Sequence, residues 1–133
     1  MIDGDLYVGC PVGNRILIWN DAKNKADGAD ADRVLGQTDF TTTTHVLSAS
    51  SIDYLYQLST DKDGNLYVSD LIMPRVLVFM NVKSKANGAD ADYVLGQPDF
   101  LSTGHATSDT RVRTMGQSLV FPEGNQTYLA LAE

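Results

Sequence analysis

Short apolar runs along the chain are separated by stretches of small and polar residues, and no stripe with the 3.6-residue period of a helix is sustained. Within the runs, β-branched and aromatic residues recur at every second position, which is typical of β-strands. The pattern predicts strands at residues 55–60, 66–69, 75–80 and 93–97. These four segments are expected to form one antiparallel sheet in chain order.

The pattern is written twice, sixty residues apart. The stretch ADGADADRVLGQTDF at 26–40 returns as ANGADADYVLGQPDF at 86–100. A third, divergent repeat begins near residue 123. Agreement over so many positions indicates a repeated structural unit, and it takes precedence over the interpretation of each acidic stretch as a binding site.

The third predicted strand of each unit is apolar on both faces. It reads Ile-Leu-Ile-Trp at 16–19 and Val-Leu-Val-Phe at 76–79. An antiparallel strand with one solvated face would alternate with polar residues, so both faces of this strand must be covered. Sheets stacked face to face on like neighbours meet that demand, and a ring of them is a β-propeller. A β-sandwich is the rival fold, but its strands show one polar face each.

The sequence thus predicts an all-β fold of four-stranded antiparallel propeller blades. The first blade, without its innermost strand, covers about 3–40, the second about 54–100, and the start of a third about 114–133. These are about two and a quarter blades, fewer than the roughly four to eight of a closed ring. Two interpretations follow: a fragment of a six-bladed ring, which we favour, or self-association through open blade edges, for which a trimer would supply six blades.

Specific motifs carry a family resemblance. Asp-Gly-Asn-Leu-Tyr-Val-Ser-Asp, a short loop and Arg-Val-Leu-Val-Phe follow one another at 63–79, and Gly-Asn-Arg-Ile stands at 13–16. With the Val-Leu-Gly-Gln-x-Asp-Phe blocks, the chain resembles the NHL-repeat β-propellers, in particular bacterial ones with lengthened repeats. The resemblance implies a six-bladed ring and suggests a secreted or periplasmic protein, although no signal peptide is visible. One departure is Cys10, which stands where the second repeat has Asp70.

Composition narrows the function classes. The formal net charge is −7 over 133 residues, and an acidic surface repels phosphate backbones, so nucleic acid is not an expected partner. No apolar run approaches the roughly 18–20 residues that cross a bilayer, so no membrane span is expected. A single cysteine excludes an intrachain disulfide.

The acidic stretches offer carboxylates of the kind that calcium prefers. The residues concerned are Asp27, Asp30, Asp32, Asp90 and Asp92. Their spacing does not fit an EF-hand loop, and turn-forming residues between the third and fourth strands explain it without a metal. No cofactor is therefore expected, with calcium or a transition metal as the alternative.

Other repeated residues point to structural roles. Arg15 and Arg75 each begin a third strand, and Asp70 lies across a short loop from Arg75, close enough in sequence to form an ion pair. Gly4 and Gly64 follow aspartates and supply the positive φ that a hairpin turn requires.

The long loops between units hold the candidate binding residues. In an antiparallel meander the connections alternate between two edges, so the loops at about 38–53 and 98–113 share an edge with the short connections at 9–14 and 69–74. Loops on a rigid frame carry most binding residues. The candidates for ligand or partner contact are His45, His105, Asp109, Arg111, Arg113 and Tyr54.

Two functions are consistent with these features. The first is a non-catalytic scaffold that binds a protein, peptide or glycan through its loops, which the absence of a convergent catalytic set in the sequence favours. The alternative is a metal-dependent lyase or hydrolase in which His45 and His105 meet at the mouth of a six-bladed ring. Fold alone does not decide between them.

Overall fold

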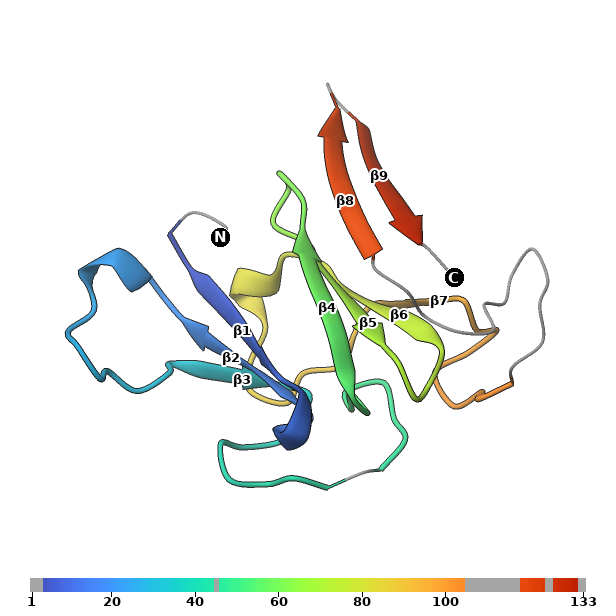
Figure 1. Ribbon diagram of the computed structural model, residues 1–133, viewed down its shortest axis with the longest axis horizontal. Helices are drawn as coiled ribbons and strands as arrows, with labels where there is room; N and C mark the ends of the chain where they lie inside the picture. The colour runs from blue at the N-terminus through green and yellow to red at the C-terminus, as the bar shows by residue number, and fades with distance from the viewer. Residues whose placement is uncertain (1–3, 45, 105–117, 124–125, 132–133) are drawn as a thin grey trace.

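The computed structural model describes residues 4–44, 46–104, 118–123 and 126–131, the last two ranges by their backbone alone. It is all-β: the described residues form antiparallel sheets with three short 3₁₀ turns (Figure 1). The first sheet comprises β1 (Leu6–Cys10), β2 (Arg15–Trp19) and β3 (Arg33–Leu35); the second comprises β4 (Leu55–Thr60), β5 (Leu66–Asp70), β6 (Arg75–Phe79) and β7 (Tyr93–Leu95); β8 (Ser118–Glu123) pairs with β9 (Gln126–Leu131).

The strands of each sheet follow chain order, as the pattern of apolar residues predicts. The predicted fourth strand is too long, because β7 ends at Leu95 and not at residue 97. The reason is local: Gly96 turns the chain with a φ of 84°, and Gln97 is buried against neighbouring loops.

The sixty-residue offset of the sequence is kept in the strand register. Leu6 faces Trp19 in the first sheet, and the corresponding Leu66 faces Phe79 in the second. At the other end of the same strand pairs, Cys10 faces Arg15 and Asp70 faces Arg75. The three strands of the first sheet therefore pair in the same register as the last three strands of the second.

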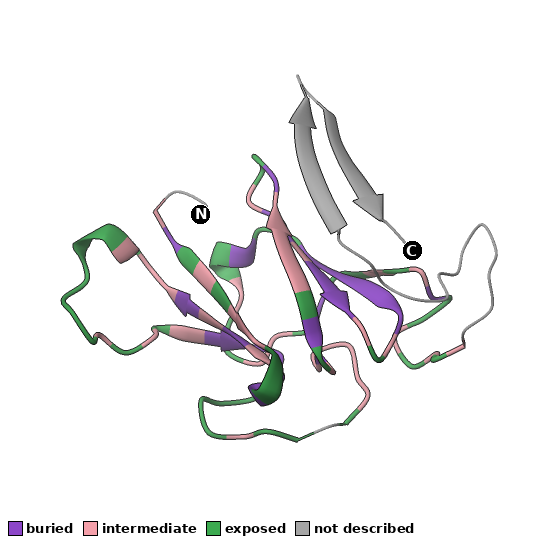
Figure 2. Cartoon of the chain, viewed as in Figure 1, coloured by how far each residue is buried: buried purple, intermediate pink, exposed green. Residues whose placement is uncertain are grey.

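The core lies between the first and second sheets. Ile16 and Ile18 of β2 belong to the same buried cluster as Leu77 and Phe79 of β6. Every residue of β6 is buried, so its two apolar faces are both covered as expected, whereas β2 alternates between buried and half-buried positions (Figure 2). The outer face of the first sheet is thus only half covered, and the described sheets do not close into a ring.

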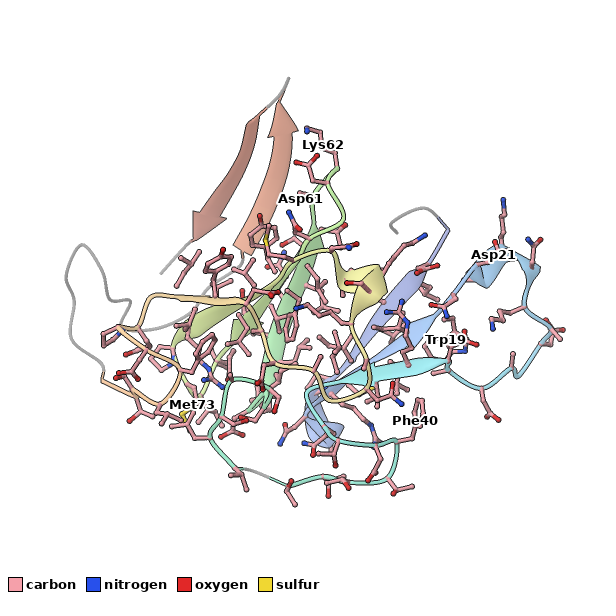
Figure 3. All side chains as sticks on the ribbon, turned by 180° about the vertical axis from the view of Figure 1, so that it is seen from behind. Trp19, Asp21, Phe40, Asp61, Lys62 and Met73 are labelled. Carbon is pink, nitrogen blue, oxygen red and sulfur yellow. The ribbon has the colours of Figure 1, made fainter. Side chains whose placement is uncertain are left out.

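The connections alternate between two edges of the sheets. The β1–β2 turn and the loop after β3 lie at one edge, and the β4–β5 hairpin lies at the other (Figure 1). Seen from behind, Asp61 and Lys62 stand at the hairpin edge, while Phe40 and Met73 stand at the opposite, loop edge (Figure 3). We call the second of these the loop edge.

At the hairpin edge, glycine conformation and one carboxylate shape the turn. Gly64 has a φ of 83°, as the Asp-Gly pair predicts, and the corresponding Gly4 has a φ of 91°. Asp61 Oδ1 accepts hydrogen bonds from the N–H groups of Asp63 and Asn65, and Oδ2 accepts one from the Tyr67 hydroxyl. The carboxylate of Asp61 is therefore occupied by the hairpin itself.

Candidate functional site

Most of the predicted ligand-contacting residues lie outside the described residues. This is so for His45, His105, Asp109, Arg111 and Arg113. Tyr54 is described: its side chain is exposed, its φ is 65°, and its N–H donates to Asn14 Oδ1 at 3.2 Å. The loop after β3 thus ends at a backbone position held against the β1–β2 turn.

A buried arginine fastens two loops to the second sheet. Arg75 Nη1 donates to the carbonyl oxygens of Phe100, at 2.6 Å, and Ser48, at 3.2 Å. Its Nη2 donates to the carbonyl oxygen of Ser51 at 2.9 Å, and Nε lies 3.4 Å from Asp70 Oδ2. One guanidinium therefore anchors the loop after β3 and the loop after β7.

Burial dominates the electrostatics of this pair. It raises the pKa of Asp70 to about 6, against the N–H of Asp53 and the charge of Arg75, which favour the carboxylate. Burial also lowers the pKa of Arg75, and the carboxylate of Asp70 opposes that shift. Both side chains are fully shielded from solvent, so this pair is suited to holding structure and not to meeting a soluble substrate.

The first repeat keeps one bond of this anchor and lacks the carboxylate. Arg15 Nη1 donates to the Phe40 carbonyl oxygen, as Arg75 does to that of Phe100. Cys10 takes the place of the aspartate. Arg15 Nε is buried and has no hydrogen-bond partner among the described residues.

A glutamine at the end of each fourth strand adds a second anchor. Gln37 Nε2 donates to the carbonyl oxygens of Asn14, at 3.3 Å, and Thr44, at 2.9 Å. Gln97 makes the same two bonds in the second repeat, at 3.0 and 2.9 Å. Sequence reasoning missed this role, and the signal was the glutamine kept in both Val-Leu-Gly-Gln blocks.

An aspartate starts each long loop. Asp39 Oδ1 accepts the N–H groups of Thr41, at 2.8 Å, and Thr42, at 2.7 Å, and these bonds hold the pKa of Asp39 well below its ordinary value. Asp99 accepts the N–H groups two and three residues further on in the same way. The arginine, glutamine and aspartate anchors together occur in both repeats.

The last aspartate of each acidic stretch is a turn residue. Asp32 Oδ2 accepts the Asn20 N–H at 2.8 Å, and its Oδ1 lies 2.7 Å from Lys25 Nζ. The hydrogen bond from Lys25, then that from Asn20, lowers the pKa of Asp32. Asp92 forms the same ion pair with Lys85, at 2.7 Å. Burial raises the pKa of Asp92, but its hydrogen bonds and the charge of Lys85 together outweigh burial and lower it.

The remaining acidic candidates do not converge. Asp27, Asp30 and Asp90 are exposed. Within the described ranges, no group of three or more His, Cys, Asp or Glu side chains is placed to hold a metal ion. The contacts shown for the acidic stretches, those of Asp32 and Asp92, therefore stabilise turns.

An amide of the second repeat crosses to the first sheet. Asn87 Oδ1 accepts the N–H of Val34 at 3.0 Å, and the N–H of Gly88 donates to the Val34 carbonyl oxygen at 3.1 Å. The turn after β6 thereby clamps the outer edge of β3. This contact gives the second acidic stretch a role in joining sheets.

A hollow lies on the outer face of the first sheet. It has a volume of about 550 Å³. Trp19 forms part of its wall and is fixed by a hydrogen bond from Nε1 to the Ala29 carbonyl oxygen at 2.8 Å. The lining residues are Arg15, Leu17, Trp19, Ala29, Asp30, Ala31 and Phe40.

Comparison with known proteins adds no identification. Neither the models of known protein families nor the curated proteins give a match to this chain. In the part of the chain that the structure describes, no helix has the length and apolar character needed to cross a membrane.

Proposed function

We propose that this chain is a non-catalytic recognition module, built from NHL-type β-propeller blades, that binds a protein or peptide at its loop edge. The observation that supports this most directly is the anchoring of the loops. Arg75 and Gln97 in the second repeat, and Arg15 and Gln37 in the first, bond to loop carbonyl groups at equivalent places. Loops held on a rigid frame lose little entropy when they bind.

The surface of these loops supplies apolar contacts. Val12 and Ile72 hold equivalent positions at the tips of the two short connections and are 94% and 51% exposed. Other large apolar side chains exposed on the same edge are Phe40, Val46, Tyr54 and Leu101. The aliphatic tips at Val12 and Ile72 favour a protein or peptide, because such interfaces are built around buried apolar anchors.

Binding to defined libraries tests the proposal. We expect the full chain to enrich peptides from a random phage-displayed library, with weaker or no retention on a glycan array. Val12→Asp and Ile72→Asp should each reduce retention of an enriched peptide at least tenfold. Met80→Asp is the matched control, because Met80 is also exposed but follows β6, away from the loop edge.

A different result would support the enzyme alternative. Stoichiometric transition metal in the purified chain, lost in His45→Ala and His105→Ala together, would point to a metal-dependent lyase or hydrolase. Equal retention of peptides by the wild-type chain and both loop-tip variants would overturn the proposed binding edge.

A further inference from the structure

The outer face of the first sheet repeats a surface that is an interface in the second sheet. In the second sheet this surface consists of four apolar residues of β5 and β6. All four belong to the buried cluster shared with the first sheet and have zero exposure. In the first sheet, Leu6 is 39% and Val8 is 36% exposed. The corresponding residues are Leu6, Val8, Leu17 and Trp19 in the first sheet and Leu66, Val68, Leu77 and Phe79 in the second.

The clamp at the rim of this surface is also repeated. A Cβ atom at Gly88 would lie 2.9 Å from Thr38 Cα, because the second-repeat turn presses against the first sheet. Gly28 is the equivalent residue, with a φ of 73°, and a Cβ atom there would meet nothing within 4 Å. The Asp27-Gly28 turn is thus equivalent to the Asn87-Gly88 clamp, but no strand edge among the described residues packs against Gly28.

The strand edge that would fit this clamp is present on β7. Val94 faces Leu77 as Val34 faces Leu17, so the N–H and carbonyl of Val94 point away from β6. Leu95 is 43% exposed, whereas the equivalent Leu35 is 1% exposed. Within the described part of the chain, the edge of β7 is therefore open, whereas the equivalent edge of β3 is bonded to Asn87 and Gly88.

We propose that the outer face of the first sheet binds the β7 edge of a second molecule of this chain, head to tail. Asp27 accepts the N–H of the partner molecule's Val94, and the Gly28 N–H donates to its carbonyl oxygen. A carboxylate oxygen makes a charge-assisted hydrogen bond here, where the amide oxygen of Asn87 accepts a neutral one. The internal contact between the two sheets is the template for the whole interface, and the surface adjoins the loop edge at Phe40.

Docking in this register has a consequence for β9. β8 contacts β4 and β5, and β9 pairs with β8. In the chain, β8 and β9 follow β7 as β4 and β5 follow β3. In the molecule that supplies β7, β9 therefore occupies the place that β1 of the other, incoming molecule requires. The incoming β1 therefore replaces β9 beside β8, which makes the association a strand exchange.

Sedimentation velocity over a concentration series of the full chain tests the interface. The wild-type chain is expected to form species larger than 14.5 kDa as concentration rises. Val8→Lys, which alters the receiving face, and Leu95→Lys, which alters the β7 edge, should each raise the dissociation constant at least tenfold. Val12→Lys is the control, because Val12 is exposed at the loop edge and belongs to neither half.

Mixing the two variants separates this interface from other modes of association. Each variant keeps one intact half, so an equimolar mixture should form a dimer and nothing larger. Loss of association in Leu95→Lys with none in Val8→Lys would indicate pairing of two β7 edges and would overturn the proposal. A wild-type chain that stays monomeric at all concentrations, or a mixture that stays monomeric, would also overturn it.

The strand exchange has its own measurement. Leu129 faces Val120 in the β8–β9 pair, and a proline at this position weakens the pairing. Leu129→Pro is expected to lower the dissociation constant, because β9 leaves more easily. An unchanged or raised constant would overturn the exchange of β9 for β1.

Discussion

Arg75 Nε lies 3.4 Å from Asp70 Oδ2, and both side chains are fully excluded from solvent. The ion pair joins the end of β5 to the start of β6 at the point where two long loops are fastened. A buried pair of this kind contributes little net stability compared with an apolar pair, but it fixes position, and loss of one member is costly. The first repeat keeps only the arginine, so the two repeats form a natural comparison.

Removal of the carboxylate in the second repeat should destabilise the fold. Asp70→Ala leaves Arg75 buried without its counter-charge and leaves the N–H groups of Asp53 and Met73 without their acceptor. We expect the free energy of unfolding at pH 7 to fall by about 3–5 kcal/mol. Urea denaturation followed by circular dichroism measures this change. Asp63→Ala removes an exposed carboxylate at the hairpin edge, and a loss as large in that control would contradict a specific role for Asp70.

The reciprocal change in the first repeat should stabilise the fold. Cys10→Asp places a carboxylate opposite Arg15, in the register that Asp70 holds opposite Arg75. The buried Arg15 Nε then gains an acceptor, and a hydrogen bond to a charged group contributes about 1.5–3 kcal/mol before the cost of burying the carboxylate. We expect a net gain of about 1 kcal/mol in urea denaturation. Cys10→Ser is the control, and a Cys10→Asp variant less stable than Cys10→Ser would show that the site cannot hold a charge.

The strands and turns were open to prediction because their causes are local. The strand at 55–60 begins and ends where the sequence pattern places it. The positive φ of Gly64 follows from the Asp-Gly pair. The pairing of β1 with β2, of β4 with β5 and of β5 with β6 follows from short connections, which join antiparallel neighbours.

The contacts between units were beyond prediction because they depend on how the sheets are placed. The bond from the Val34 N–H to Asn87 joins residues 53 positions apart, and neither residue type announces it. The glutamine anchors are similar: Gln37 and Gln97 were visible as repeated residues, but their bonds to loop carbonyl groups depend on the turn at the preceding glycine. Repetition marks such residues as structural without showing their partners.

The protonation of Asp70 should make stability depend on pH in an unusual direction. Its pKa is raised from 3.8 to about 6 by burial, so the folded chain binds a proton more tightly than the unfolded chain between these values. The stability contributed by Asp70 is therefore present below pH 3.8 and is lost as pH rises through 6. The stability of the wild-type chain minus that of Asp70→Asn should fall from pH 4 to pH 7 in urea denaturation. A rise in that difference would mean that the attraction to Arg75 outweighs burial.

Close packing at one glycine should make it far less tolerant than another of the same conformation. Gly36 has a φ of 87° and Gly64 a φ of 83°, so alanine is strained in both by about 1–2 kcal/mol. A Cβ atom at Gly36 would lie 2.7 Å from the Asn14 carbonyl oxygen and 2.9 Å from Ile52 Cδ1, whereas at Gly64 it would meet nothing within 4 Å. Overpacking adds about 1–3 kcal/mol, so thermal melts should show a larger loss for Gly36→Ala than for Gly64→Ala. Equal losses would mean that Ile52 and the backbone at Asn14 move aside freely, contrary to the tight packing of Gly36 against both.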